Sequence, residues 1–132
     1  MGSAFQGIRK IGQIYMRAVD LRRATAFYRD TLSIPFLFEA PPRMAFFDLS
    51  GVRLLLGEPE GKEADHPGSI LYFDVPDLGA AHAELLSRGV KFDSAPHLIA
   101  DMGDRELWMA FFKDSEDNQL ALMSETPKTK TA

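Results

Sequence analysis

Residues 13–20 read QIYMRAVD, an alternating and β-rich stretch that ends at an aspartate. Asp20 suits a helix N-cap, and the apolar residues after it keep helical spacing until Pro35 forbids further helix. The same pattern returns at residues 70–77, which read ILYFDVPD and end at Asp77. The offset between the two stretches is 57 residues, both from Gln13 to Ile70 and from Asp20 to Asp77. They predict two copies of a strand followed by a capped helix.

A second repeat extends each copy. The tetrapeptide MAFF occurs at 44–47 and again at 109–112. Each occurrence precedes turn residues and then a further apolar strand, at 52–56 and at 119–123. Each half therefore predicts a strand, a helix and about three strands joined by hairpins. The sequence indicates an α+β fold made of two tandem β-α-β-β-β modules.

The length of 132 residues fits a single domain, residues 1–132. We place the first module at 8–58 and the second at 69–124. Between them, residues 59–68 are rich in glycine, proline and charge and are predicted to be a linker. The terminal segments, residues 1–8 and 125–132, are expected to be loose ends.

Composition excludes several classes of protein. There are 15 Lys and Arg against 19 Asp and Glu, and the net charge of −4 argues against nucleic-acid binding. The absence of cysteine excludes disulfides, thiolate metal sites and a cysteine nucleophile. No apolar run approaches the roughly 20 residues of a membrane span. The first residues lack signal-peptide and myristoylation patterns, so we expect a cytoplasmic protein without a membrane partner.

Four motifs carry a resemblance to a known family. They are VDL at 19–21, AFY at 26–28, VPDL at 75–78 and FKDSEDN at 112–118. With them the chain resembles the vicinal oxygen chelate superfamily, which includes glyoxalases, bleomycin-resistance proteins and extradiol dioxygenases. The resemblance covers about residues 8 to 124. It implies curved mixed sheets around a cavity, the glyoxalase-like fold.

The last of these motifs departs from the usual Asp-Pro-Asp-Gly-Asn turn of the family. Ser115 and Asp117 occupy the proline and glycine places. Because aspartate tolerates left-handed backbone geometry fairly well, we expect the turn to form.

The resemblance also implies a divalent metal site with up to four ligands, one from the first and one from the last strand of each half. The matching positions here are Gln13, Leu55, Ile70 and Ala121. A glutamine serves at the first position in some glyoxalases, but the other three side chains are hydrocarbon. Zn²⁺, Ni²⁺ and Fe²⁺ need histidine, carboxylate or thiolate donors. We therefore expect no metal and no other cofactor.

Three histidines are candidates for chemistry. His66 lies in the predicted linker and is expected to be exposed, and His82 borders the apolar stripe of the second helix. His97 is either a polar group at the rim of a pocket or a solvated loop residue. Glu106 is either a general base, if it is partly desolvated, or an exposed strand acid. A metal held by His97 with Asp101 or Glu106 has no recognisable ligand spacing.

Residues 105–112 alternate between two faces of a strand. Trp108 shares a face with Glu106, and the sequence does not say whether this face lines the family cavity or packs under a helix. Trp108, the one tryptophan, is predicted to form either a pocket wall or part of the core under a helix. The expected cavity is mostly apolar, and its predicted lining is Gln13, Tyr15, Leu55, Ile70, Tyr72, Trp108, Ala121 and Met123.

Two functions remain open at this stage. The first is a metal-free protein of the bleomycin-resistance kind, which binds a small aromatic or amphipathic molecule. The alternative is a glyoxalase- or dioxygenase-type enzyme (a lyase, isomerase or dioxygenase) with an unrecognised metal site or a His97 and Glu106 acid–base pair. In either case we expect a homodimer, because open sheets with apolar concave faces need to be covered in water.

Overall fold

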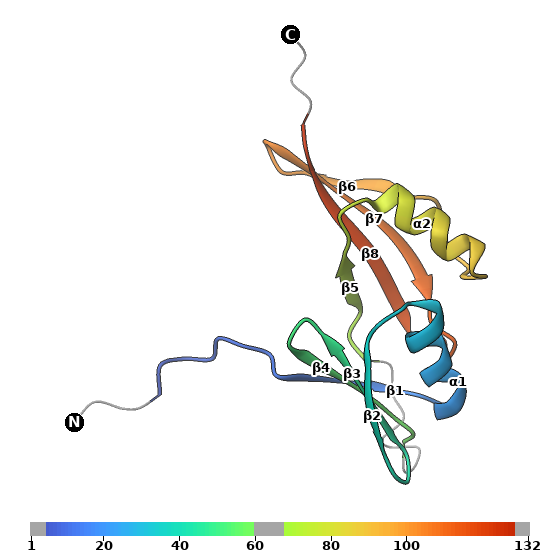
Figure 1. The fold of residues 1–132 in the computed structure, drawn as a ribbon. Coiled ribbons are helices and arrows are strands. Elements are labelled where there is room, and N and C mark those ends of the chain that lie inside the picture. Colours follow the sequence, from blue (N-terminus) through green and yellow to red (C-terminus); the bar gives the residue numbers. More distant parts are fainter. Residues whose placement is uncertain (1–4, 60–67, 129–132) are drawn as a thin grey trace.

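A computed structural model of the chain describes residues 5–59 and 68–128. Most of the predicted linker, with His66, and the ends at 1–4 and 129–132 lie outside these residues. The elements of the first module are β1 (Gln13–Arg17), α1 (Leu21–Ala26), the π-helical turn η1 (Phe27–Thr31), β2 (Phe36–Ala40), β3 (Met44–Leu49) and β4 (Val52–Gly57). Those of the second are β5 (Leu71–Asp74), α2 (Leu78–Ser87), β6 (His97–Asp101), β7 (Arg105–Lys113) and β8 (Gln119–Pro127), as Figure 1 shows.

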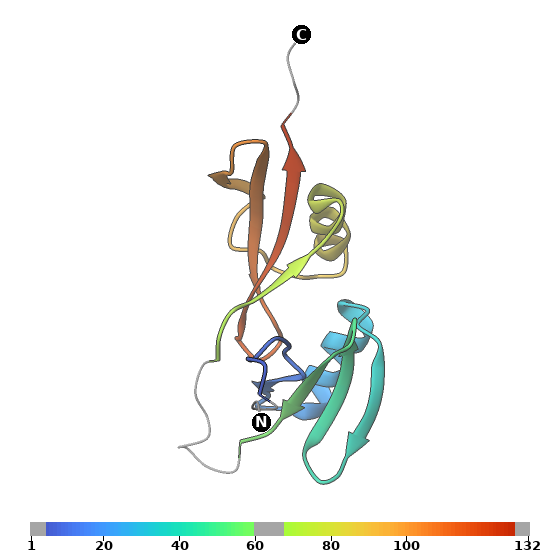
Figure 2. The same cartoon turned by 90° about the vertical axis from the view of Figure 1, so that its left-hand side faces the viewer.

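Each module forms one mixed four-stranded sheet. The first sheet has the order β1-β4-β3-β2 and the second the order β5-β8-β7-β6. In each, the first strand runs parallel to the last, and the other pairs are antiparallel. The two sheets follow one another along the molecule, and each carries its helix on one face (Figures 1 and 2). The predicted α+β fold with two β-α-β-β-β modules is confirmed.

Both helices begin where the sequence predicts. The Asp20 carboxylate accepts a hydrogen bond of 3.2 Å from the backbone N–H of Arg23, and Asp77 accepts one of 3.0 Å from Ala80. These bonds satisfy backbone donors that an uncapped helix end would leave without partners. At the end of α2, Gly89 has φ +89°, a left-handed conformation that suits glycine.

The two modules share one hydrophobic core. On each sheet, alternate side chains point toward the helix and are buried. The largest buried side chains include Phe47 and Leu54 of the first module and Phe112 and Leu120 of the second, and all four belong to one contiguous cluster. Tyr28 of η1 is fully buried in the same cluster. The modules are therefore held together by shared packing as well as by the chain.

Polar contacts between the modules converge on the turn at 114–118, here called the intermodule turn. Asp114 accepts hydrogen bonds from the backbone N–H groups of Glu116 and Asn118, both at 2.8 Å. Its other carboxylate oxygen accepts a 2.6 Å hydrogen bond from the hydroxyl of Tyr28. Asp117, at the glycine place of the family motif, has φ +64°. The turn forms as expected, and it joins the first module through Tyr28.

Glu116 and Asn118 make further contacts with the first module. The guanidinium of Arg23 donates two hydrogen bonds to the Glu116 carboxylate, at 2.7 and 3.1 Å, and the backbone N–H of Asp20 donates a third at 2.7 Å. Asn118 donates to the carbonyl oxygen of Arg17 at 2.9 Å. Burial by itself would raise the pKa of Glu116, but these donors outweigh burial and lower it.

The chain ends differ from expectation at the C-terminal side. Residues 125–127 were expected to be loose, but they continue β8, where Pro127 lies opposite Arg105 of β7. The longer strand arises because β7 is also long and supplies partners along its whole length. At the other end, residues 5–12 form no helix or strand and run away from the first sheet (Figure 1). No helix in the described part of the chain is long and apolar enough to cross a membrane.

Candidate functional site

The first sheet has a face without a helix, here called its open face. On β1, Met16 is buried in the core on the helix side, so the residues on either side of it, Tyr15 and Arg17, lie on the open face. On β4, Leu54 and Leu56 are buried in the same way. By alternation and register, the open face of the first sheet includes Gln13, Tyr15, Arg17, Phe46, Arg53 and Leu55.

The second sheet resolves which side of strand 105–112 faces the helix. Ala110 and Phe112 are fully buried in the core, and Trp108 packs against the same core. The odd-numbered residues therefore lie on the open face of this sheet. By alternation and register, that face includes Tyr72, Leu107, Met109, Phe111, Ala121 and Met123.

Aromatic rings gather on both open faces. On the first sheet, Phe38 and Phe46 stack with ring centroids 4.6 Å apart, and the guanidinium of Arg53 lies 5.8 Å from the centroid of Phe46. On the second, the rings of Tyr72 and Phe111 make an edge contact at 6.3 Å. Flat rings with a cation beside them are suited to stacking on aromatic ligands.

Tyr15 lies along the first sheet because of a neighbouring glycine. Its hydroxyl donates a 3.1 Å hydrogen bond to the carbonyl oxygen of Gly57. A Cβ placed on Gly57 would lie 2.9 Å from Cε2 of the Tyr15 ring, which is closer than real Cβ atoms approach. Glycine at 57 therefore permits the position that the Tyr15 ring takes on the open face.

The predicted catalytic pair is not brought together. His97 is exposed on β6 opposite Met109, with its ring 6.2 Å from that of Phe111 on the open face. Glu106 lies on the helix side of β7, where it accepts a 3.3 Å hydrogen bond from the indole N–H of Trp108. The expected rim of His97, Glu106 and Trp108 is therefore split between the two faces of the second sheet.

The prediction that Trp108 lines the cavity with the other residues is therefore wrong, because its side chain lies on the helix side of β7. Together with Glu106 it lines a different hollow, of about 550 Å³, beside Leu78 and Ser124. The other predicted lining residues remain on or next to the open faces.

His82 lies at the edge of the apolar stripe of α2, as the sequence predicts. Its ring makes an edge contact with the ring of Phe92, with the ring centroids 4.4 Å apart.

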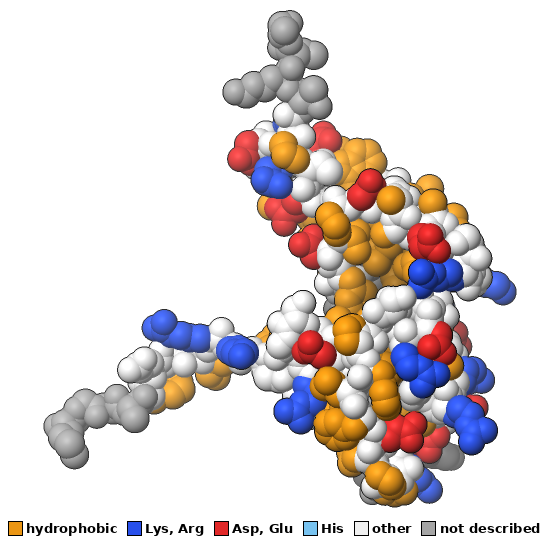
Figure 3. Space-filling view, in the orientation of Figure 1, with side chains coloured by type: hydrophobic (Ala, Val, Ile, Leu, Met, Phe, Trp, Pro, Cys, Tyr) orange, Lys and Arg blue, Asp and Glu red, His pale blue; other side chains and the backbone are white. Residues whose placement is uncertain are grey.

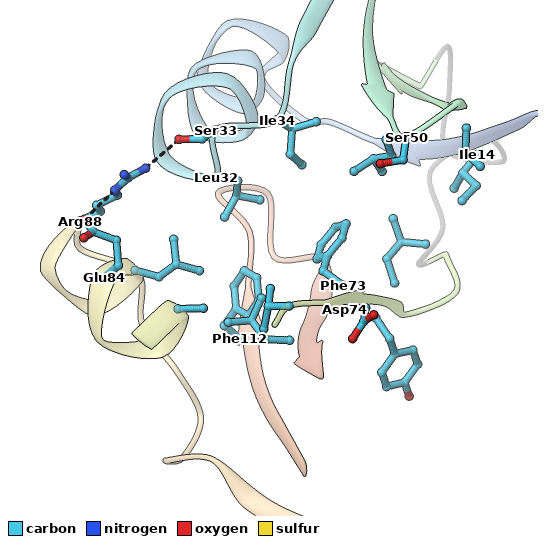
Figure 4. A pocket seen from close by; sticks show the side chains of 18 residues that line it. Ile14, Leu32, Ser33, Ile34, Ser50, Phe73, Asp74, Glu84, Arg88 and Phe112 are labelled. Carbon is cyan, nitrogen blue, oxygen red and sulfur yellow. Dashed lines mark hydrogen bonds and ion pairs between the residues drawn. The ribbon is translucent and has the colours of Figure 1, made fainter. Parts of the chain in front are cut away.

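A separate cleft of about 600 Å³ lies between the modules, on their helix-facing sides. Figure 4 shows Ile14, Leu32, Phe73 and Phe112 pointing into it from both modules. At its margin the Arg88 guanidinium donates 2.9 Å hydrogen bonds to the Thr31 carbonyl oxygen and the Ser33 hydroxyl. These bonds connect α2 to the end of η1. No pattern in the sequence predicts this cleft, because its walls come from segments far apart in the chain.

Comparison with known proteins agrees with this geometry. Residues 10–122 match the sequence model of the Glyoxalase/Bleomycin resistance protein/Dioxygenase superfamily. The chain belongs to this superfamily. The uncharacterized protein YraH of Bacillus subtilis (strain 168) is 26% identical over 129 residues, which cover 86% of this chain and 96% of YraH.

Solved structures of the superfamily share the fold. A lactoylglutathione lyase from Agrobacterium tumefaciens has a TM-score of 0.72 at 20% identity, covering 89% of this chain and 95% of the lyase. TnmS3, an antibiotic binding protein from Streptomyces sp. CB03234, has a TM-score of 0.73 at 20% identity, covering 94% of this chain and all (100%) of TnmS3. The two neighbours carry different activities on one fold, so the fold alone does not assign a reaction.

The side chains at the family's metal positions do not suit a divalent cation. Gln13 is exposed at the start of β1, diagonally across from Leu55, and Ile70 directly precedes β5, close to Ala121 on β8. Together they offer one amide and three hydrocarbon groups. Within residues 5–59 and 68–128, no three histidine, aspartate or glutamate side chains are grouped so that they could hold a metal ion. The donor set found here disagrees with the metal that the family implies.

Sequence reasoning missed part of the open faces. Phe46 and Phe111 belong to the repeated MAFF motif, and alternation from the buried Phe47 and Phe112 would have placed them on the side away from the helix. The tetrapeptide alone predicts that the two phenylalanines of each pair lie on opposite faces of the strand. It does not indicate which of the two packs under the helix.

Proposed function

We propose that this protein binds a small aromatic or amphipathic molecule on its open faces, without a metal ion. The observation that carries the proposal is the make-up of those faces. They present Phe38, Tyr72, Met109 and Phe111, while the positions where relatives would coordinate a metal are mostly hydrocarbon. Apolar and aromatic walls with a few polar groups are the usual lining of a small-molecule site.

Polar groups on the first sheet would orient such a ligand. The Arg53 guanidinium beside Phe46 offers hydrogen-bond donors to an oxygen of the ligand, and Gln13 offers an amide. An aromatic ligand with a carbonyl, phenol or acidic group fits this combination. TnmS3, which shares the fold, is described as an antibiotic binding protein, and this supports a binding role for the same scaffold.

We further propose that two copies assemble to complete the site. Each chain leaves both open faces uncovered, with Tyr15 and Tyr72 nearly half exposed. In a homodimer the open face of one chain's first sheet would meet that of its partner's second sheet. Burying these apolar faces would stabilise the assembly at roughly 25 cal/mol per Å² of apolar surface.

The test is titration of the purified protein with anilinonaphthalene sulfonate, an amphipathic aromatic probe, followed by fluorescence. Tyr72→Ala should weaken binding at least about fivefold, because it removes one wall of the site. Leu86→Ala is the matched control, since Leu86 on α2 is 48% exposed and Tyr72 is 46% exposed. Equal effects of the two substitutions would contradict the proposal. Elemental analysis showing one first-row metal per chain would favour the enzymatic alternative.

A further inference from the structure

The hollow beside Trp108, here called the α2 hollow, lies on the helix side of the second sheet, away from the open faces. It forms where β7 and β8 run on beyond the N-terminal end of α2 and the helix no longer covers them (Figure 1). Glu106 and Trp108 line it from β7, and Ser124 lines it from β8. Its volume of about 550 Å³ falls within the roughly 300–1,000 Å³ of small-molecule sites.

One side chain that lines the α2 hollow is buried without a hydrogen-bond partner. Ser124 is only 4% exposed, and alternation from the buried Leu122 directs its side chain to the helix side of β8. The Ser124 hydroxyl makes no hydrogen bond with any residue that the structure describes. Because buried hydroxyls nearly always have a partner, an unpaired one that lines an open hollow points to a polar group of a ligand.

The α2 hollow also holds a carboxylate without a cation. Glu106 accepts the hydrogen bond from the indole N–H of Trp108, and no basic side chain in the described part of the chain forms an ion pair with it. Lys128, at the same end of the sheet, is paired with Asp101 at 2.6 Å. Asp77 adds a second carboxylate at the margin. Figure 3 shows acidic and hydrophobic side chains over the start of α2, and basic side chains at the opposite end of that helix. This charge favours a positively charged ligand group.

Trp108 places an aromatic surface between the carboxylate and the hydroxyl. In the register of β7 and β8, Ser124 lies directly opposite Trp108 and diagonally across from Glu106. Diagonal neighbours of this kind are about 7–8 Å apart or less, and the Glu106 side chain leans toward Trp108. An ammonium group has three N–H donors, so it suits both oxygens at once, and a tryptophan ring attracts cations and packs against apolar groups.

We propose that the α2 hollow binds a primary organic amine on an apolar or aromatic body. The ammonium group lies between the Glu106 carboxylate and the Ser124 hydroxyl, and the body packs against Trp108. This site is on the other side of the sheet from the open faces. It therefore depends neither on the ligand nor on the dimer proposed above.

The probe for the test is phenethylamine, titrated into the full chain by calorimetry and by tryptophan fluorescence. Trp108 is the only tryptophan in the sequence, so a change in its emission reports a ligand at this hollow. Phenethyl alcohol is the matched control ligand, because it carries a hydroxyl in place of the ammonium group. It should bind at least about tenfold more weakly, since the charge-assisted hydrogen bond is lost. Equal affinities, or no saturable binding of phenethylamine, would overturn the proposal.

Substitutions test the two oxygens. Glu106→Gln removes the charge with little change in shape and should raise the dissociation constant of phenethylamine at least about fivefold. Ser124→Ala should raise it about two- to fivefold, and an unchanged affinity would overturn the role of the hydroxyl. Glu125→Gln is the matched control, because Glu125 lies on the open face of the same sheet beside Arg105. Equal weakening by Glu106→Gln and Glu125→Gln would overturn the assignment to the hollow.

The same titrations separate this site from the one on the open faces. Tyr72→Ala should leave the affinity for phenethylamine within about twofold of the parent, because distant sites contribute independently. Glu106→Gln should likewise leave the binding of anilinonaphthalene sulfonate unchanged. Loss of phenethylamine binding in Tyr72→Ala would place the amine on the open face and overturn the proposal. Failure of anilinonaphthalene sulfonate to bind would count against the open-face site alone.

Discussion

The hydroxyl of Tyr28 donates a 2.6 Å hydrogen bond to the carboxylate of Asp114, joining the first module to the intermodule turn of the second. Both residues are buried, and Tyr28 is fully so. Burial, and then the nearby Asp114 carboxylate, raises the pKa of Tyr28 well above its usual value. The hydroxyl therefore stays protonated and remains a donor. Motifs that identify the superfamily in the sequence act here to hold the two modules together.

Removing this donor should destabilise the whole chain. Tyr28→Phe is expected to lower the free energy of unfolding by about 1–3 kcal/mol, because a buried carboxylate loses one of its donors. The measurement is urea-induced unfolding followed by circular dichroism. Tyr72→Phe is the control, since its hydroxyl is on an exposed ring, and it should change stability by less than about 0.5 kcal/mol. Equal losses from both substitutions would contradict the structural role of Tyr28.

Glu116 should give the protein a characteristic loss of stability in acid. Its pKa in the folded state is lowered, so its contribution is complete above the unfolded pKa, near 4.3 for a glutamate, and is lost as the pH falls through the folded value. At neutral pH, Glu116→Gln should cost about 1–2 kcal/mol. Thermal unfolding should be measured from pH 7 to about pH 3. The difference in melting temperature between the parent and Glu116→Gln should become smaller as the pH falls.

Glu125→Gln provides the comparison for this pH series. Glu125 lies 3.9 Å from Arg105 at the surface, and such exposed pairs contribute little. If the difference in melting temperature between the parent and Glu116→Gln stays constant across the pH series, this would contradict the lowered pKa of Glu116.

The backbone of Asp117 predicts opposite effects for two small substitutions. Its φ of +64° is a conformation that glycine adopts without cost and that most side chains disfavour by roughly 1–2 kcal/mol. Asp117→Gly, which restores the usual residue of the family turn, should leave stability unchanged or raise it. Asp117→Ala should lower it by about 1 kcal/mol. Chemical unfolding of both variants is the measurement, and an alanine variant more stable than the glycine variant would refute the argument.

Gly57 and Tyr15 should be energetically coupled. Gly57→Ala would force the Tyr15 ring from its place, at a cost of about 1 kcal/mol. In a chain that already carries Tyr15→Ala, the same substitution should cost little, because the ring that it meets is gone. A double-mutant cycle of unfolding free energies measures the coupling. Additive effects would mean that the ring does not lie over Gly57.

The fold was predictable because its signals are local and occur twice. Asp20 and Asp77 cap helices by bonding to backbone groups three residues away, and Gly89 ends a helix by its own conformation. Such features can be recognised from neighbouring residues alone. Their repetition at a constant offset made the duplication clear.

The site was less predictable because its geometry is set by long-range packing. Alternation sorted residues 105–112 into two sets, but only the position of α2 shows that Trp108 faces the core and Met109 does not. The bond between Tyr28 and Asp114 joins residues 86 positions apart. Both residues stood in recognised motifs, yet nothing in either motif indicates that they meet.

The central claim, a metal-free site for an aromatic ligand, is tested most directly by chelation. The protein would be titrated with anilinonaphthalene sulfonate before and after exhaustive treatment with EDTA, and its melting temperature recorded for both samples. Because Leu55, Ile70 and Ala121 offer no donor to a metal, we predict the same affinity and the same melting temperature in both samples. A loss of binding after chelation, restored by one equivalent of Zn²⁺ or Ni²⁺ and abolished by Gln13→Ala, would contradict the account.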